Sequence, residues 1–167
     1  CRIIANDVYE NDAVRAYAEY VDLDTLYRES DIITIHTPLL PETTGMIDRE
    51  AIAKMKDGVV FIDNARGELV DIDAVTEAVE SGKFGALFMD AFPGETGIIH
   101  VPHDEDIIRT PGMPYFKLKY LRSFVNVYHT PHMAFFTEEA AEQMAECGVN
   151  SIYEILTEGK SKHEIPC

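Results

Sequence analysis

The chain has 167 residues, of which 30 are acidic and 14 are lysine or arginine, so its formal net charge is −16. An apolar content of 46% and a charged content of 26% are ordinary for a globular protein, and the length suits one domain. The acidic balance disfavours binding to nucleic acid or anionic membranes, and no apolar stretch reaches the roughly 18–20 residues needed to span a bilayer.

The cysteines indicate a reducing compartment. The chain has an odd number of cysteines, three, at the widely spaced positions Cys1, Cys147 and Cys167, and no Cys-x-x-Cys pair occurs. This pattern favours reduced thiols in a cytoplasmic protein over a disulfide framework or a zinc ribbon. Because the chain opens on Cys1 and the apolar pair Ile3 and Ile4 follows almost at once, we expect it to begin inside a structural element, as a fragment of a longer protein.

Short apolar runs alternate with helical patterns in the first part of the chain. Residues 3–6 predict a strand, residues 22–29 a short acidic helix, and residues 32–35 a second, β-branched strand. Residues 48–56 predict a helix with Asp48 as its N-cap, and Gly58 predicts the end of that helix.

The alternation continues through the second part. Residues 59–62 and 86–89 predict strands, and the helix between them starts near Asp71 or Asp73 and stops at Gly82. A long connection covers residues 91–124, of which residues 114–121 are a candidate helix.

The end of the chain gives the clearest pattern. Residues 125–128 predict the last strand. Thr137 predicts the N-cap of a final helix that ends at Gly159, and its alkyl and methionine stripe is typical of packing rather than of a cofactor site.

Continuous apolar runs of four residues suit strands that are buried on both faces. Strands separated by helices favour crossover connections and a parallel sheet. The sequence therefore predicts an α/β fold with a doubly wound parallel sheet and a C-terminal helix.

Ionisable residues follow the predicted strands. In open parallel sheets, ligands bind beyond the carboxyl ends of the strands. The groups found there are Asp7, His36-Thr37-Pro38, Asn64-Ala65-Arg66, Asp90 and His132. A single one of them is readily explained as a solvated loop residue, but five at one edge indicate a ligand site.

Asp7 has the position of the acid that ends the second strand of a dinucleotide-binding unit. A carboxylate there accepts hydrogen bonds from the adenosine ribose and repels a 2′-phosphate, which favours NAD over NADP. The glycine-rich phosphate loop belongs to the preceding strand, roughly 20 residues upstream, and is absent from this sequence. The alternative is an ordinary aspartate before a turn.

Three residues are candidates for the chemistry. The planar guanidinium of Arg66 suits bidentate binding of a carboxylate, although Arg66 also has Glu68 and Asp71 nearby as possible surface partners. His132 is the candidate acid and base, and Glu95 is the carboxylate that would favour its charged form.

Other histidines compete for a role: His36, His100, His103, His129 and His163. His100 and His103 lie close to Asp104, Glu105 and Asp106 and resemble a metal-ligand spacing. Zinc sites normally need three or four ligands on well-held elements, so we interpret this stretch as an exposed acidic loop and predict no metal.

Four motifs in order resemble the D-isomer-specific 2-hydroxyacid dehydrogenases, and most closely their D-lactate dehydrogenase branch. They are SDIITIHTPL with the following PET, FIDNARGELVD, MDAFPGE and TPHMAFFT. The resemblance extends over essentially the whole chain. It implies a Rossmann-like NAD-binding domain that lacks its first βα unit over residues 1–136. Residues 137–167 would be a C-terminal helix and tail that return to a missing substrate domain.

The resemblance also implies roles for individual residues. Arg66 would bind the substrate carboxylate, His132 would be the general acid and base, and Glu95 would hydrogen-bond His132. The residues implied to bind NAD are Asp7, Thr37, Pro38, Thr43, Asn64, Ala65, Arg66 and Asp90.

The expected full-length protein is a cytoplasmic, homodimeric, NAD-dependent enzyme that interconverts a 2-oxo acid and a D-2-hydroxy acid, D-lactate or a bulkier one. The fragment alone would be inactive. The alternative is a non-catalytic NAD(H)-sensing module of the same fold. Formate oxidation is disfavoured because that relative usually carries glutamine where Glu95 stands.

Overall fold

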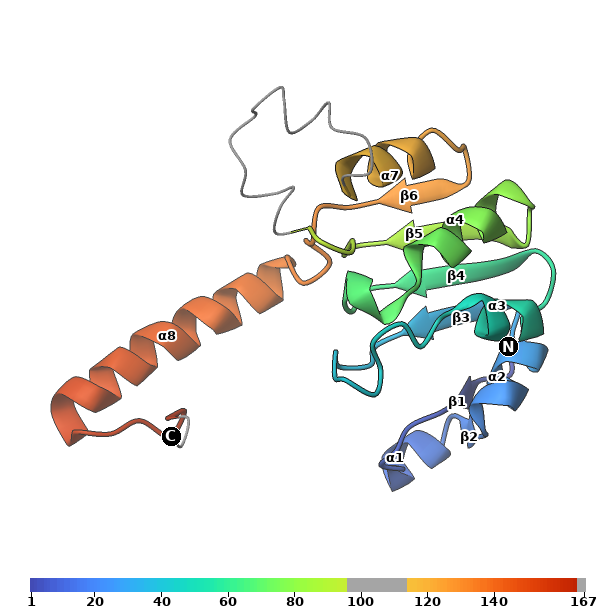
Figure 1. Cartoon of the computed structure of the whole chain (residues 1–167). Coiled ribbons are helices and arrows are strands. Elements are labelled where there is room, and N and C mark those ends of the chain that lie inside the picture. Colours follow the sequence, from blue (N-terminus) through green and yellow to red (C-terminus); the bar gives the residue numbers. More distant parts are fainter. Residues whose placement is uncertain (96–113, 165–167) are drawn as a thin grey trace. The chain divides into compact units, whose positions relative to one another are not determined.

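All strands pair in parallel within residues 1–95 and 114–164, the part of the chain that the computed structural model describes (Figure 1). The shorter sheet joins β1 (Ile4–Ala5) to β2 (Glu19–Tyr20). The larger sheet has the order β3-β4-β5-β6, with strands Ile32–Ile35, Val59–Asp63, Phe84–Met89 and Val127–His129. The predicted parallel α/β architecture is therefore confirmed.

Helices connect the strands, and several of them begin after a capping side chain. The helices are α1 (Asp12–Arg15), α2 (Leu23–Glu29), α3 (Arg49–Lys54), the 3₁₀ helix η1 (Gly67–Leu69), α4 (Ile72–Glu80), α7 (Pro114–Leu121) and α8 (Glu138–Glu158). Carboxylates accept the first backbone N–H groups of three of these helices, at Asp22, Asp48 and Asp71. These side chains satisfy donors that have no partner inside a helix.

Several predicted boundaries need correction. The helix that starts after Asp48 ends at Lys54 with Met55 as its C-cap, two residues before the predicted end at Lys56. Gly58 is not its stop and instead turns the chain into β4 with a φ of 79°. Strand β5 starts at Phe84, two residues before its predicted start. Strand β6 starts at Val127, two residues later than its predicted start at residue 125. The short elements α1 and β2 were not predicted.

One face of the larger sheet carries the core. Alternate residues of β3, β4 and β5 point to this face, and α2, α3 and α4 pack beside one another in sequence order, with α4 against β5 (Figure 1). Phe61 of β4 stacks on Phe84 of β5, and neither ring is exposed. This packing fixes the strands whose ends bear the candidate residues.

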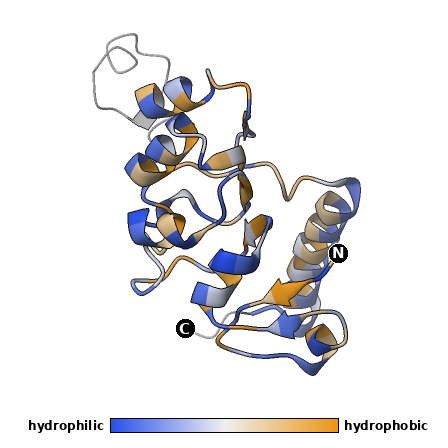
Figure 2. Cartoon of the chain, turned by 90° about the vertical axis from the view of Figure 1, so that its right-hand side faces the viewer, coloured by the Kyte–Doolittle hydropathy of each residue, from blue (hydrophilic) through white to orange (hydrophobic). Residues whose placement is uncertain are grey.

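The opposite face of the sheet differs from the prediction. Burial on both faces was expected, but Ile32 is 63% exposed and Tyr128 is 53% exposed. Strands β3 and β4 therefore bury alternate side chains. In the shorter sheet, β1 is hydrophobic and its partner β2 is hydrophilic (Figure 2).

The chain divides into two units, Cys1–Pro131 and His132–Cys167. The second unit contains α8, which Thr137 caps by accepting the Ala140 N–H and which Gly159 ends in the left-handed conformation. No residue of α8 is buried, so the predicted apolar stripe is exposed. Among the described helices, none combines the length and apolarity that a bilayer-spanning segment needs.

Candidate functional site

The predicted ligand edge follows the observed strand ends. Strand β3 ends at Ile35, β4 at Asp63 and β5 at Met89, so His36, Asn64 and Asp90 each stand directly after a strand. Because the strands are parallel and adjacent, the loops after them leave the same edge of the sheet (Figure 1).

Arg66 lies on a loop that the end of β4 holds in place. Asp63 is fully buried, and its Oδ1 accepts the Ala65 N–H at 2.9 Å. The Arg66 guanidinium donates to the Ala65 carbonyl at 2.8 Å, and η1 starts at the next residue with the buried Leu69 as its anchor. This arrangement fixes the backbone from which the exposed Arg66 side chain projects.

The surface pairing considered for Arg66 is not what the described residues show. Asp71 binds Arg49, with the guanidinium Nη1 at 3.2 Å from Oδ2. Glu68 accepts the Gly94 N–H at 3.2 Å. Neither carboxylate forms an ion pair with Arg66 within the part of the chain that is described.

Glu95 closes a tight turn after β5. Its N–H donates to the Phe92 carbonyl at 3.0 Å, and its Oε2 accepts the Phe92 N–H at 3.1 Å. Gly94 adopts a φ of 73° inside this turn. The turn packs directly on the Arg66 loop, since a Cβ on Gly67 would lie 2.2 Å from the carbonyl carbon of Phe92.

A cavity of about 390 Å³ opens between the ends of β3 and β4. Its lining residues are His36, Thr37, Pro38, Leu39, Ala65 and Arg66. Thr43 is not in this lining; its hydroxyl donates to the Pro38 carbonyl at 2.7 Å and accepts the Leu40 N–H at 2.8 Å. Thr43 therefore shapes the loop that forms one wall.

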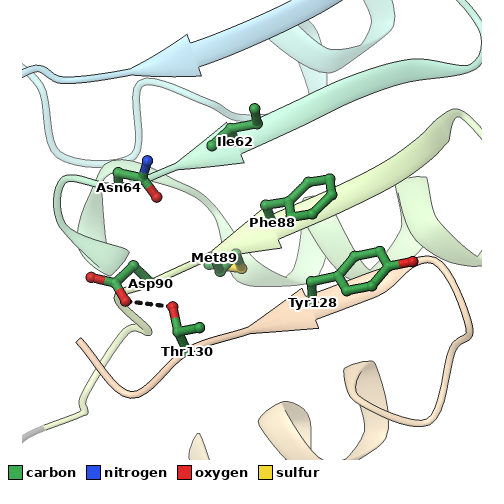
Figure 3. Close-up of a pocket in the computed structure, with 7 residues that line it drawn as sticks. All are labelled: Ile62, Asn64, Phe88, Met89, Asp90, Tyr128 and Thr130. Carbon is green, nitrogen blue, oxygen red and sulfur yellow. Dashed lines mark hydrogen bonds between the residues drawn. The ribbon is translucent and has the colours of Figure 1, made fainter. Parts of the chain in front are cut away.

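A second cavity of about 220 Å³ holds two other predicted cofactor residues (Figure 3). Asn64 and Asp90 line it together with Ile62, Phe88, Met89, Tyr128 and Thr130. Asp90 is 4% exposed and accepts a hydrogen bond from the Thr130 hydroxyl, and the Phe88 and Tyr128 rings stack at 4.6 Å (Figure 3). Six of the eight predicted cofactor residues thus line one of the two cavities, whereas Thr43 and Asp7 line neither.

Asp7 is not among the residues that line either cavity, and His132 belongs to the second unit. Asp7 is exposed after β1, and its Oδ1 accepts the Tyr9 N–H at 2.9 Å. His132 is the first residue of the second unit and has a φ of 52°, which is unusual for a residue other than glycine. The proximity of His132 to Arg66 and Glu95 stays a prediction.

Two titratable groups near the site were not among the predicted residues. Burial, with Glu68 and Asp90 close by, raises the pKa of Asp63 to about 6. Burial also lowers the pKa of His129, and the nearby Arg122 adds to this effect. An acid at the end of the apolar run 59–62 was the available signal for Asp63.

The structure describes some of the remaining histidines. His36 lies in the larger cavity with its Nε2 2.9 Å from the Thr34 hydroxyl. His100 and His103 lie outside the described residues. Residues 1–95 and 114–164 contain no cluster of three or more His, Cys, Asp or Glu side chains suited to a metal.

Comparisons with known proteins agree on one family. Residues 1–134 match the family described as D-isomer specific 2-hydroxyacid dehydrogenase, NAD binding domain. The chain is 39% identical over 166 residues to the aromatic 2-oxoacid reductase of Clostridium sporogenes (strain ATCC 15579), and this match covers 99% of this chain and 49% of that protein. It is 38% identical over 160 residues to the D-lactate dehydrogenase of Lactobacillus delbrueckii subsp. bulgaricus, and this match covers 95% of this chain and 46% of that protein.

A solved structure is similar over the whole chain. The crystal structure of D-lactate dehydrogenase with NAD+ from Lactobacillus jensenii has a TM-score of 0.87 and 34% sequence identity, and the match covers 100% of this chain and 48% of that one. The chain therefore spans about half the length of the curated relatives it matches.

Proposed function

This chain belongs to the D-isomer specific 2-hydroxyacid dehydrogenase family through its NAD-binding domain, and we propose that the full-length protein interconverts a 2-oxo acid and a D-2-hydroxy acid with NAD. The reaction is a reversible hydride transfer. The proposed substrate is D-lactate or a related bulkier hydroxy acid. The alternative of a non-catalytic NAD(H)-sensing module is not favoured, because the matched relatives are named as dehydrogenases and reductases.

One observation carries this proposal. Arg66 projects from the end of β4 into the 390 Å³ cavity beside Thr37, Pro38 and Ala65. A guanidinium binds a carboxylate through two parallel hydrogen bonds, and a 2-oxo acid presents a carboxylate next to its reacting carbonyl. On a chain with a net charge of −16, such a local positive group is what attracts an anionic substrate.

The described residues fit a dinucleotide. The exposed Asp7 uses its Oδ1 for the Tyr9 N–H, and its other oxygen suits the adenosine ribose hydroxyls. Thr37, Pro38, Ala65 and Arg66 would hold the cofactor in the larger cavity, Asn64 and Asp90 would hold it in the smaller one, and Thr43 would support the wall. When bound, NADH supplies the hydride that reduces the carbonyl carbon.

The chain's own groups supply the rest of the chemistry. Arg66 fixes the substrate carboxylate and polarises the adjacent carbonyl. His132 donates a proton to the carbonyl oxygen during reduction and accepts it back during oxidation. Glu95 favours the charged imidazole, because a neighbouring carboxylate stabilises a cation.

The proposal is tested by measuring NADH oxidation by the full-length protein with pyruvate, 2-oxoisocaproate and phenylpyruvate. We expect turnover of at least one acid, and a fall in kcat of about 10²–10⁴-fold in His132→Ala. His163→Ala is the matched control, because His163 is a surface histidine whose backbone N–H bonds Ser161, and it should retain full activity.

Unchanged turnover in His132→Ala would refute the role of that histidine. A full-length protein that binds NADH but reduces none of the three acids would instead support the sensing module.

We also propose that the full-length protein is a cytoplasmic homodimer whose cofactor domain ends near residue 136, with residues 137–167 returning to a substrate domain. The free cysteines Cys1 and Cys147 and the acidic charge agree with a cytoplasmic location. The exposed apolar side chains of α8 agree with a partner surface elsewhere in the protein. Light scattering of the full-length protein would give the mass of a dimer.

A further inference from the structure

We propose that Glu68 is a positioning residue, which holds the Arg66 loop and the Glu95 turn in one fixed arrangement. The inference rests on the proposed function, since the relative placement of Arg66 and Glu95 matters only if both act on the same substrate. Glu68 was considered above as a surface partner of Arg66, and the structure gives it different contacts.

Glu68 bonds two other loops at the carboxyl edge of the sheet. Its side-chain Oε1 accepts the Gly94 N–H at 3.2 Å, in the turn that follows β5. Its backbone carbonyl accepts the Gly45 N–H at 2.9 Å, in the turn that follows β3. Glu68, in the segment that follows β4, therefore joins the loops after the three neighbouring strands β3, β4 and β5.

Close backbone packing reinforces the side-chain bond. Gly67 stands so near the turn that an added Cβ would lie 2.2 Å from the carbonyl carbon of Phe92 and 2.3 Å from the nitrogen of Pro93. Phe92 is 1% exposed and Leu69 is fully buried, so both sides of this contact are anchored in the core. A shift of the Glu95 turn is therefore passed to the Arg66 loop.

Glu68 connects the segment that carries Arg66 to the turn that carries Glu95. Arg66 is two residues before Glu68. Glu95 is the residue after Gly94, whose N–H the Glu68 carboxylate accepts. Arg66 would orient the substrate carboxylate, while Glu95 would maintain the charge of the proton donor. Both functions require that the two side chains keep a constant separation, because misplacement by about 1 Å costs up to about 100-fold in rate.

The test compares full-length Glu68→Ala, Glu68→Gln and Glu80→Ala with the wild type in 2-oxo acid reduction across pH. Glutamine keeps an oxygen acceptor for Gly94. Glu80 is the matched control: its Oε1 also accepts one hydrogen bond, from the Tyr120 hydroxyl at 2.7 Å, and it joins α4 to α7 away from the site. Both alanine variants lose one exposed hydrogen bond, so they should lose similar thermal stability.

We expect Glu68→Ala to lower kcat/KM about tenfold and to move the alkaline fall of the pH profile about half a unit toward lower pH. Glu68→Gln should restore both values, and Glu80→Ala should leave both unchanged. If Glu68→Ala does not fold, Glu68→Asp is used, because it keeps the charge but withdraws the acceptor by one methylene; it should show the same changes in smaller degree.

A wild-type profile in Glu68→Ala or Glu68→Asp, or an equal change in Glu80→Ala, overturns this inference while the proposed function stands. A wild-type protein that reduces no 2-oxo acid overturns the proposed function, and the inference with it.

Discussion

Gly67→Ala is the substitution whose effect follows most directly from the packing of the Arg66 loop. The new Cβ would lie 2.2 Å from the Phe92 carbonyl carbon, 2.3 Å from the Pro93 nitrogen and 2.7 Å from the Phe92 Cα. Ordinary Cβ contacts lie at 3.4–4 Å, so the two backbones must separate by about 1 Å. Because all three neighbours are backbone atoms, no side-chain rotation relieves the contact.

The expected cost is about 3 kcal/mol of unfolding free energy, the upper part of the range for overpacking a buried site. This loss corresponds to a fall in melting temperature of roughly 10 °C. Thermal unfolding followed by circular dichroism measures it. The loop shift should also raise the KM for the 2-oxo acid in the full-length protein.

Gly148→Ala is the matched control. Gly148 lies inside α8 and an added Cβ would meet nothing within 4 Å. Alanine is the better helix former, so this variant should gain about 0.5–1 kcal/mol in α8. A Gly67→Ala protein as stable as the wild type would show that the close approach of η1 to the Glu95 turn is wrong.

Three further substitutions have defined outcomes. In the folded protein the pKa of Asp63 is raised from 3.8 to about 6. The stability that this shift contributes is fully present only below the unfolded pKa of 3.8, and it is lost as the pH rises through about 6. The stability advantage of Asp63→Asn over the wild type should therefore grow by about 2.5 kcal/mol from pH 4 to pH 8 in urea unfolding, and a constant difference would contradict the assignment. Thr137→Ala removes the acceptor of the Ala140 N–H and should cost about 1 kcal/mol of helix stability, seen as faster amide hydrogen exchange in the first turn of α8. Asp7→Ala should raise the Kd for NADH about tenfold, the value of one hydrogen bond of roughly 1.4 kcal/mol, and an unchanged Kd would exclude ribose binding by Asp7.

Local chemistry explains why most of the fold was predictable. Asp48 and Thr137 were predicted as caps, because a short polar side chain that accepts a backbone N–H acts within four residues of itself. The apolar runs that form β3 and β4 were likewise visible without tertiary information.

The errors arose where tertiary contacts decide the structure. The start of β5 was placed too late because Gly85 is typical of a turn, yet it lies inside the strand, where an added Cβ would be 2.5 Å from the Gly58 carbonyl oxygen. Strand β2 has two residues, too few for any periodicity, and exists through its pairing with β1. Val125 is apolar but 95% exposed, so the last strand begins after it.

The kinds of residue in the candidate site were predictable from the sequence, but their arrangement was predictable only in part. Parallel strands require that the groups after β3, β4 and β5 leave one edge, which brought Arg66 and the Thr37-Pro38 peptide to one cavity. The separate cavity of Asn64 and Asp90 depends on side-chain packing between β4, β5 and β6, which the sequence pattern does not encode. The buried Asp63 was missed for the same reason, because a carboxylate loses its solvent only in the folded chain.

The product formed from pyruvate by the full-length protein tests the central claim most directly. Chiral chromatography of the reaction with NADH should give the D enantiomer of lactate alone, one molecule for each NADH consumed, and Arg66→Gln should sharply reduce its yield. Formation of the L enantiomer, or NADH binding without any hydroxy acid, would contradict the account.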